Sequence, residues 1–580
     1  ELDSTERMRV LGISAFHRDS AAAVCVDGEL LAAAQEERFS RVRADSGLPR
    51  RAARWCLERA GLHSSDLDAV VFYEKPLRKF ERTLAVQLQG FPRSARSFSR
   101  GLFLWLGDRL WLRTQLAEEF GVEPAKVQFV EHARSHAALA FYSSPFPRAA
   151  VLVVDDLGEW ASTTLARGEG ATLATLAELH HPHSLGLWCS AYTQFLGFEP
   201  GLDEERVEAL AHGGAPCWER EVADTVPALA GGAFEVDTRL FRFAHDAERL
   251  FDPALEQRFG PARQAGGRLR TEAGDSRDAD LAASVQRVLE ERVLALAREL
   301  HARTGLDALC LGGEVFRNRT LVARLAHDGP FRELFAPAAF GEAGAAAGAA
   351  LEHSQSHGVP RRAQRPRLAL GESFDPVGAM EAAGVRGAAL GGNASAPRQL
   401  AELLRAGRTL AWVRGPDELG RESLGARLIL CAATQAGARE RLLGALARAD
   451  ARALVRVLVR EEDAEVWLEL PNAARALARH ALCTARASPA LRAAAPSALL
   501  SHAVVWPQLV VREWDPALHA LLGELGRDGQ APVALAASLH LRGQPIASSA
   551  ADVLDAFARS TLDALALEDW LIEADGAPRE

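Results

Sequence analysis

Short apolar runs alternate with longer amphipathic stretches along the chain, and this alternation predicts an α/β fold. In the first part of the chain, polar or glycine-containing turns separate the apolar runs, and Asp27-Gly28 is a hairpin signal. Strands are predicted at residues 9–14, 21–26, 30–35, 67–73 and 126–130. Helices are predicted at residues 49–60, 80–120 and 131–141.

The same order of elements begins again near residue 150, so the chain contains a weak internal repeat. In the second half of this repeat, strands are predicted at residues 150–154, 160–166 and 308–311, and an acidic turn at 155–158. Helices are predicted at residues 280–305 and 342–351. Two lobes of this kind would form an actin-like, ribonuclease-H-like duplication whose acidic turns face a nucleotide. From the pattern alone, a coincidence of two buried hairpins is the simpler explanation.

A polar stretch rich in His, Ser, Gln, Pro and Arg follows at 352–367 and is the clearest linker signal. Beyond it, predicted strands at 409–413, 455–459, 504–511 and 533–537 alternate with Ala/Leu/Arg helices. We therefore expect a first domain at 8–352, a linker at 353–367 and a separate α/β domain at 368–580.

Composition narrows the class of protein. The chain has 580 residues, 48% of them hydrophobic, with a net charge of −10, which fits a multidomain globular protein. The acidic balance and the absence of a basic, aromatic stripe argue against nucleic-acid binding. No apolar run reaches the roughly 18 residues of a membrane span, and nothing resembles a signal peptide. The seven scattered cysteines form no CxxC pair, so we expect a reducing, cytoplasmic setting.

His132 and His136 are the first candidate metal ligands. They stand at i and i+4 on a predicted helix, so both imidazoles point to one face and could bind one ion. With 17 histidines in the chain, however, this spacing arises by chance about half a time. Two helix histidines with ordinary hydrogen bonds are the alternative.

Other candidates are weaker on the sequence alone. Gly312-Gly313 after an apolar strand could let backbone approach a phosphate, although a plain strand-to-helix turn explains it equally. Residues 180–183, with three histidines around a proline, are predicted to be a loop. Guanidinium groups suit oxyanions, but in a chain this rich in arginine each is more simply a surface charge. These arginines are Arg414, Arg421, Arg427, Arg456 and Arg542.

Several longer motifs, in a fixed order, carry a resemblance. They are Leu11-Gly-Ile-Ser-Ala-Phe16, Ala32-Ala-Ala-Gln-Glu-Glu-Arg-Phe39, Val70-Val-Phe-Tyr-Glu-Lys-Pro-Leu77, Glu131-His132 with Ser135-His136, Gly158-Glu-Trp160, Pro182-His-Ser-Leu-Gly-Leu187, Cys310-Leu-Gly-Gly313 and Arg542-Gly-Gln-Pro545. With them, the chain from Met8 onward resembles the carbamoyltransferases of the nodulation and antibiotic-tailoring type.

The resemblance implies an α/β architecture: a duplicated actin-like (ASKHA) N-terminal domain that binds ATP and one iron, and a YrdC-like C-terminal domain that binds carbamoyl phosphate. In such enzymes the two co-substrates yield a carbamoyl-adenylate, and the carbamoyl group passes to a hydroxyl or amine of a natural product. A metal and basic groups hold the phosphates, while a base deprotonates the acceptor.

The resemblance also implies site residues. The divalent metal ligands would be His132, His136 and Glu342, the last in place of the family's aspartate. Nucleotide-binding residues would be Asp155, Gly158, Gly312, Gly313 and Asn318, and carbamoyl-phosphate-binding residues Arg427, Arg456, His502 and Arg542. The histidine that activates the acceptor aligns with Arg18, one position after His17. On a strand, His17 would point the opposite way, so only a shifted loop would let it serve.

Four acidic departures fall at positions expected to face ligands: Asp156, the run 203–206, Glu314 where the family has glycine, and Glu422 where it has a phosphate-binding arginine. New carboxylates beside phosphates would repel them. Two hypotheses therefore stand. One is a carbamoyltransferase-like enzyme that transfers a carbamoyl or related acyl group. The other is a catalytically degenerate member that acts as a paralogous subunit or binds a metabolite. We expect a small-molecule acceptor and either a homo-oligomer or a paralogous partner.

Overall fold

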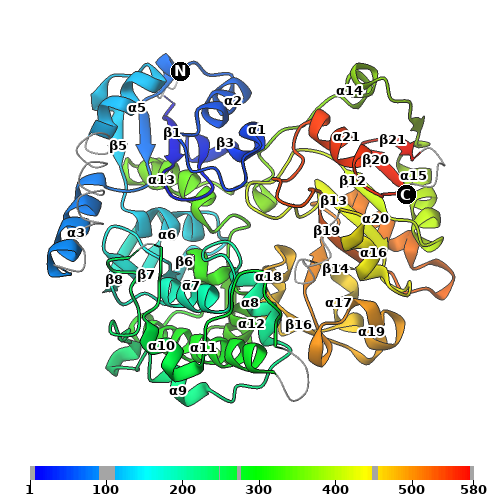
Figure 1. Ribbon diagram of the computed structural model, residues 1–580. Helices are drawn as coiled ribbons and strands as arrows, with labels where there is room; N and C mark the ends of the chain where they lie inside the picture. Colours follow the sequence, from blue (N-terminus) through cyan, green and yellow to red (C-terminus); the bar gives the residue numbers. More distant parts are fainter. Residues whose placement is uncertain (1–6, 91–110, 247, 271–275, 447–454, 575–580) are drawn as a thin grey trace. The chain divides into compact units, whose positions relative to one another are not determined.

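The computed structural model describes residues 7–90, 111–246, 248–270, 276–446 and 455–574. The chain divides into two compact units (Figure 1). The first comprises residues 1–33 and 47–364, and the second residues 34–46 and 365–580. The second unit is thus assembled from two stretches of chain, although no shift in composition marks residues 34–46.

A five-stranded sheet begins the first unit, with the strand order β3-β2-β1-β4-β5. β1 is antiparallel to β2 and parallel to β4, and β4 is parallel to β5. The strands are β1 (Arg9–Ser14), β2 (Ala21–Val26), β3 (Glu29–Gln35), β4 (Ala69–Phe72) and β5 (Val127–Phe129). The predicted strands therefore lie within two residues of the observed ones.

A second five-stranded sheet has the order β8-β7-β6-β9-β10, which repeats the order of the first. Its middle strand β6 is antiparallel to β7 and parallel to β9, as β1 is to β2 and β4. The strands are β6 (Arg148–Val154), β7 (Ala161–Glu169), β8 (Thr172–His180), β9 (Ala308–Gly312) and β10 (Glu333–Phe335). The weak repeat in the sequence is therefore a true duplication, and the predicted actin-like α/β class is confirmed.

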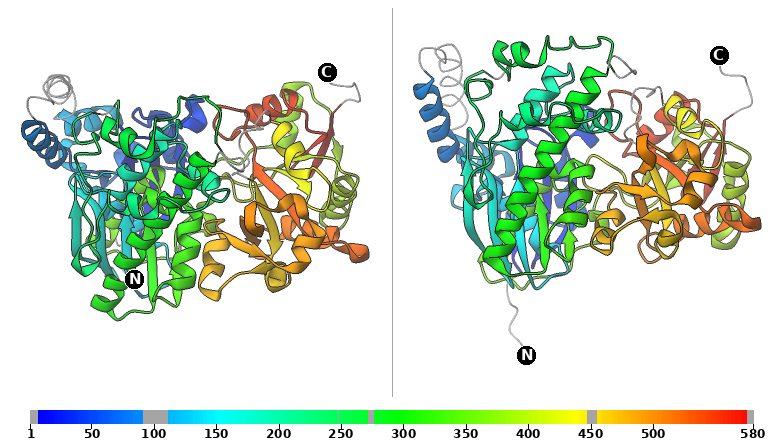
Figure 2. Two further views of the ribbon diagram at one scale, coloured as in Figure 1. Left: turned by 60° about the horizontal axis from the view of Figure 1, so that its bottom comes forward. Right: turned by 90° about the horizontal axis from the view of Figure 1, so that it is seen from below.

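Helices cover these sheets. α13 (Glu342–Ser356) packs against β1, β2 and α6 (His132–Tyr142), and α11 (Arg277–Thr304) packs against β6 and β7 (Figure 2). The other α-helices of this unit are α2 (Arg50–Ala60), α3 (Pro76–Gln89), α5 (Leu112–Phe120), α7 (Leu185–Phe195), α8 (Glu204–Ala211), α9 (Glu219–Ala223), α10 (Pro253–Phe259) and α12 (Arg319–Asp328). Residues 91–110 of the predicted helical stretch 80–120 lie outside the described residues.

The Ala/Gly composition of α13 has a packing cause. A Cβ on Gly348 would lie 1.9 Å from the carbonyl oxygen of Ser135 on α6, and a Cβ on Gly12 of β1 would lie 2.0 Å from that of Ala346. Such contacts exclude any side chain. The small residues therefore hold α13, α6 and β1 close together, and these are the elements that carry the site described below.

The second unit contains a mixed eight-stranded sheet of order β11-β21-β20-β12-β13-β19-β14-β18. Its strands are β11 (Ala388–Ala389), β12 (Leu410–Val413), β13 (Arg427–Ala432), β14 (Arg456–Arg460), β18 (Pro507–Val510), β19 (Ala534–Ser538), β20 (Ala564–Leu567) and β21 (Trp570–Glu573). A small sheet joins β15 (Leu468–Glu469), β16 (Ala485–Ala487) and β17 (Val504–Val505). The strand predicted at 504–511 is therefore two strands, β17 and β18, in different sheets.

α15 (Gly392–Arg405) and α20 (Pro516–Leu525) pack on each other, and residues of both join the core with Leu410, Leu428 and Leu458 from the sheet. The other α-helices are α1 (Glu37–Ser40), α14 (Pro376–Ala383), α16 (Ala438–Gly444), α17 (Ala464–Trp467), α18 (Arg475–Arg479), α19 (Pro489–Ala494) and α21 (Ala550–Ala558). This α/β architecture agrees with the predicted class of the C-terminal domain.

Arginines of the segment 34–46 attach it to the rest of the second unit. Arg38 is buried, donates a hydrogen bond of 2.6 Å to the carbonyl oxygen of Gly420, and lies 3.4 Å from Asp417. Arg41 donates to the carbonyl oxygens of Pro545 and Ile546. The motif at 32–39 thus supplies side chains to a unit whose other residues begin at 365.

All seven cysteines are free thiols. Within the described ranges, no helix combines the length and apolarity that a membrane crossing requires.

Candidate functional site

Two buried histidines and two buried carboxylates converge in the first unit. His132 is the first residue of α6 and His136 lies one turn later, Asp155 follows β6, and Glu342 begins α13. The ligand atoms of these four side chains all lie within 4.8 Å of one another. Nε2 of His132 is 2.9 Å from Oδ2 of Asp155 and 3.5 Å from Oε1 of Glu342. The structure therefore brings together all three sequence-predicted metal ligands, with Asp155 as a fourth group.

Electrostatics make this cluster a cation site. Burial opposes an imidazolium, but the carboxylates of Glu342 and Asp155 outweigh it and raise the pKa of His132 to about 10. Burial likewise opposes ionised carboxyl groups, yet the facing histidines hold the pKa of Asp155 and of Glu342 well below their usual ranges. The two carboxylates thus stay ionised away from water because an imidazolium faces them, and a metal ion bound by the cluster would take the place of that positive charge.

The donor set fits a divalent transition metal. Nε2 of His136 lies 3.1 Å from Nε2 of His132 and 3.1 Å from Oδ2 of Asp155. Two imidazole nitrogens this close repel unless a proton or a metal ion lies between them. Two imidazoles with carboxylates suit iron or zinc rather than magnesium or calcium. One oxygen of Glu342 has no hydrogen-bond partner among the described residues and so remains available as a ligand atom.

His17 and Arg18 lie beside the cluster, in the turn between β1 and β2 rather than on a strand. Phe16 and Asp19 have positive φ angles of 71° and 51°, so the alternation of a strand does not apply. Nδ1 of His17 lies 3.3 Å from Oε1 of Glu342, and the guanidinium of Arg18 pairs with Asp156. The argument that His17 would point away from the site is therefore wrong, because the turn directs both side chains toward it.

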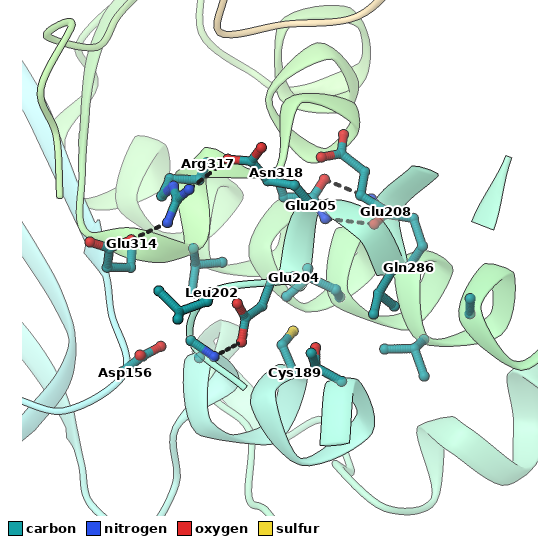
Figure 3. Close-up of a pocket in the computed structure, with 18 of the residues that line it drawn as sticks. Asp156, Cys189, Leu202, Glu204, Glu205, Glu208, Gln286, Glu314, Arg317 and Asn318 are labelled. Atoms are coloured by element: carbon teal, nitrogen blue, oxygen red, sulfur yellow. Dashed lines mark hydrogen bonds and ion pairs between the residues drawn. The ribbon is translucent and has the colours of Figure 1, made fainter. Parts of the chain in front are cut away.

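A cavity adjoins the cluster on the side of Asp156 and holds about 720 Å³, including its opening to solvent (Figure 3). Its polar lining is mainly acidic: Asp156, Glu204, Glu205, Glu208 and Glu314, with Arg18 and Arg317. Burial, only partly offset by Arg18, raises the pKa of Asp156 to about 6, and the nearby carboxylates add to the shift. The cavity thus concentrates negative charge where the resemblance implies a nucleotide.

Glu314 occupies the position best suited to an anion. Its Oε1 accepts a hydrogen bond of 3.1 Å from the backbone N–H of Glu342, at the N-terminus of α13. Its Oε2 accepts from Arg317, which also donates to Glu205 at 2.6 Å (Figure 3). Helix N-termini and arginines are the usual phosphate ligands. Here Glu314 accepts a hydrogen bond from the N-terminus of α13, and Glu314 and Glu205 both accept from Arg317.

The other predicted nucleotide-binding residues lie around the same elements. Gly158 lies against His132, and Gly312 lies against the carbonyl of His136. Gly313 has a φ of 96°, and a Cβ there would lie 2.3 Å from the carbonyl oxygen of Val154. These glycines allow close packing around the metal cluster. Asn318 caps α12 through the N–H of Leu321 and pairs with the amide of Gln286.

Two family models match this chain. "Carbamoyltransferase N-terminus" matches residues 9–351, and "Carbamoyltransferase C-terminus" matches residues 401–574. The chain belongs to the carbamoyltransferase family. Membership supports a transferase and carbamoyl transfer in general.

Similar proteins span most of this carbamoyltransferase-family chain. It is 36% identical to the uncharacterized protein sll1178 of Synechocystis sp., over 73% of this chain and 70% of that protein. It is 30% identical to the nodulation protein NolNO of Sinorhizobium fredii, over 97% of this chain and 80% of that one. The crystal structure of (R)-2-hydroxyglutaryl-CoA dehydratase component A from Acidaminococcus fermentans matches 60% of this chain and 99% of that one, at 14% identity and a TM-score of 0.33.

In the second unit of this family member, the predicted carbamoyl-phosphate residues have protein partners. Arg427 is fully buried and donates to the carbonyl oxygens of Gly415, Ala426 and Glu372. Arg456 is 1% exposed, and its Nη1 donates to Oε2 of Glu422 at 3.0 Å. His502 and Arg542 are both exposed, His502 in a short 3-10 helix (Ser501–Ala503) and Arg542 on a turn. A carboxylate therefore faces the guanidinium of Arg456, where the resemblance implies a phosphate.

Sequence reasoning missed two residues of the cavity, Glu208 and Arg317. Glu204 and Glu208 stand at i and i+4 on α8, so they share one face of that helix. This i, i+4 spacing was the sequence signal that could have placed Glu208 beside Glu204 in the cavity. On an amphipathic helix, however, it is also the pattern of a solvated acidic face. Only the packing of α8 against α11 shows that Glu208 is buried.

Proposed function

We propose that the chain transfers a carbamoyl or related acyl group to a hydroxyl or amine of a small-molecule acceptor, at a centre built around a divalent metal. The observation that carries the proposal is the buried convergence of His132, His136, Asp155 and Glu342. A site of two imidazoles and two ionised carboxylates with no function would be costly to bury. Iron is the metal that the resemblance implies.

Each group at this centre has a chemical role. The four ligands fix the ion, and a bound divalent ion supplies Lewis acidity toward a carbonyl or hydroxyl oxygen. His17 has a side chain that is 33% exposed and lies 3.3 Å from Glu342, so it reaches both solvent and the cluster. In the proposal, its imidazole accepts the proton of the acceptor's hydroxyl or amine, and Glu342 orients the ring. Arg18, held by Asp156, positions the same turn.

The adenylate route that the resemblance implies, from ATP and carbamoyl phosphate, requires two anion sites. In the first unit, Glu314 and Glu205 engage the helix N-terminus and Arg317. In the second, Glu422 engages Arg456. These residues do not fit a triphosphate or a phosphate as the structure stands, so we assign no step to ATP. The assay below therefore offers carbamoyl phosphate both with and without ATP.

The same ion pairs favour a second candidate function. A chain that no longer activates carbamoyl phosphate could serve as a subunit beside an active paralogue, or as a metabolite-binding protein. The specific observation in its favour is Glu422, which accepts hydrogen bonds from Arg456 at 3.0 Å and from Ser538 at 2.8 Å. Under this candidate the metal centre would have a structural or ligand-binding role.

Metal analysis combined with a transfer assay tests the proposal. The purified protein should contain about one equivalent of iron or another transition metal. Labelled carbamoyl phosphate, with and without ATP, is offered with aminoglycoside- or sugar-type acceptors, and both labelled product and pyrophosphate are measured. His136→Ala should abolish metal content and transfer. His180→Ala, at an exposed histidine on β8, is the matched control.

Each outcome of this assay supports one of the two candidate functions or overturns the proposal. Metal with transfer supports the enzyme, and pyrophosphate release would show that ATP is used despite Glu314. Metal without transfer to any acceptor, together with co-purification of an intact paralogue, supports the second candidate. A protein that lacks metal after expression in iron- and zinc-supplemented medium overturns the metal centre and the proposal with it.

A further inference from the structure

The cavity beside Asp156 is strongly acidic for its size. Five carboxylates line it against two guanidinium groups. Both guanidinium groups are already engaged, since Arg18 pairs with Asp156, and Arg317 pairs with Glu314 and Glu205. From outside the lining, Arg319 lies 3.6 Å from Glu205. Among the described residues neither Glu204 nor Glu208 forms an ion pair, although Arg18 attracts Glu204 and Arg319 attracts Glu208. The five carboxylates still outnumber these three guanidinium groups, so the charge of the cavity remains negative.

Glu208 points to a ligand independently of this charge. Its side chain is 2% exposed, and its Oε1 accepts two hydrogen bonds of 2.7 Å, from the backbone N–H and the hydroxyl of Thr320. Its Oε2 is also buried but has no hydrogen-bond partner within the described part of the chain. A buried carboxylate oxygen without a donor is unfavourable, because it has lost its hydration and gained no hydrogen bond in exchange. An N–H donor entering the cavity would satisfy it.

The lining also indicates which kind of cation this would be. Among the described residues, the only group spaced to hold a metal ion is the cluster at His132, so the cavity carboxylates do not converge on one point. Apart from Thr193, Gln286 and Asn318, the remaining wall is mostly apolar, with Leu202, Val207, Ala282, Val285, Leu289 and Val315. Separated carboxylates beside an apolar wall suit an organic cation with a hydrocarbon body better than a compact, strongly hydrated metal ion.

We propose that this cavity binds an organic amine or guanidinium compound, and not the nucleotide that the resemblance implies. In this proposal the cationic nitrogen donates to Oε2 of Glu208, Glu204 adds negative charge to the same cavity, and the hydrocarbon body packs on Val207, Val285 and Leu289. The inference does not depend on carbamoyl transfer, because binding alone defines it. A triphosphate in the same place would face Glu314, Glu204 and Asp156.

Calorimetric titration of the full-length protein tests the inference. The probes are hexylamine, 1,6-diaminohexane and agmatine, with hexanol as the uncharged control, Mg²⁺ and Mn²⁺ alone, and ATP with Mg²⁺. We expect at least one amine to bind and hexanol not to bind. Glu208→Gln and Glu204→Gln should each weaken amine binding about tenfold or more, because each removes a facing charge. Glu118→Gln, at an exposed position on α5, should leave it unchanged.

Circular dichroism shows whether Glu208→Gln or Glu204→Gln folds poorly. If one of them does, the other still tests the inference. Tight ATP binding that Glu314→Gly strengthens would overturn the inference in favour of a nucleotide. Binding of Mg²⁺ or Mn²⁺ that depends on Glu208 would overturn it in favour of a second metal site. Absence of binding by all three amines would overturn it as well. Metal content at the His132 cluster and carbamoyl transfer are measured in separate assays, so failure of amine binding is distinguishable from failure of the proposed function.

Discussion

Oε2 of Glu422 lies 3.0 Å from Nη1 of Arg456 and 2.8 Å from the hydroxyl of Ser538. Arg456 is almost fully buried, so the carboxylate neutralises a guanidinium that water does not reach. Removal of one partner from such a pair leaves an uncompensated charge, at a cost of about 3–5 kcal/mol. Glu422 therefore supplies, within the second unit, the negative charge that compensates the buried guanidinium of Arg456.

Glu422→Gln should consequently open an anion site at Arg456. We expect a lower melting temperature than wild type, recovered in part by inorganic phosphate or carbamoyl phosphate, which should bind the variant about tenfold more tightly. Thermal unfolding and calorimetric titration measure both effects. Glu402→Gln, which breaks the exposed pair with Arg398 on α15, is the matched control. Equal phosphate affinity in variant and wild type would contradict the interpretation of Glu422.

Glu342→Gln should reduce bound metal about tenfold or more, because an amide is a far weaker ligand than a carboxylate. Glu342→Asp, which introduces the aspartate that the resemblance implies at this position, should retain metal. Glu352→Gln lies on the same helix and removes the pair with Arg134 at 2.6 Å, so it controls for changes in α13. Elemental analysis of the three purified variants is the measurement. Full metal content in Glu342→Gln would remove Glu342 from the ligand set.

Glu290 on α11 should make stability depend on pH. Burial raises its pKa to about 7 from 4.5, although a hydrogen bond from Gln286 opposes the shift. Between these values the native state retains a proton that the unfolded chain releases, so stability falls as pH rises. The loss is about 3 kcal/mol at most, at about 1.4 kcal/mol per pH unit.

The measurement is the change in melting temperature between about pH 5 and about pH 8. Glu290→Gln should make this change smaller and should be more stable than wild type at the higher pH. Glu118→Gln, at an exposed position, should behave as wild type. An identical pH profile in wild type and Glu290→Gln would show that the carboxyl group ionises normally in the folded protein.

Gly348→Ala should destabilise the first unit by about 2 kcal/mol or more, because its Cβ would lie 1.9 Å from the carbonyl of Ser135. Since Ser135 and the two metal-site histidines share α6, we also expect lower metal content. Gly444→Ala, on a helix with no atom within 4 Å of the added Cβ, should be neutral or stabilising by up to about 1 kcal/mol. Chemical denaturation and elemental analysis compare the two. Equal stability would mean that α6 and α13 separate at little cost.

Much of the fold follows from local pattern, since the strands of both sheets are short apolar runs between clear turns. β8 was missed because most of its residues are exposed and its polar and apolar positions do not alternate cleanly. The duplication was ambiguous because it concerns the pairing of strands far apart in sequence. Only the shared strand order establishes it.

Some residues of the candidate site can likewise be predicted from local pattern, whereas others depend on the tertiary structure. His132 and His136 could be paired from helical spacing alone, because a helix fixes the relation of i to i+4. Asp155 and Glu342 come from other elements. Only the resemblance joined Glu342 to the histidines, and Asp155 was expected among the nucleotide-binding residues, so its place beside the histidines was not predicted. The position of His17 depends on the positive φ angles of Phe16 and Asp19, which the sequence does not indicate. The buried state of Glu208 depends on the packing of α8, and local pattern does not reveal it.

Residues 34–46 have a consequence for how the molecule is made. Arg38 and its partner Gly420 are 382 positions apart, so Arg38 leaves the ribosome long before Gly420 is translated. Synthesis of nearly the whole polypeptide must therefore precede completion of the second unit. A gene divided at residue 364 would also fail to separate two self-sufficient products, because residues 365–580 would lack Arg38 and Arg41.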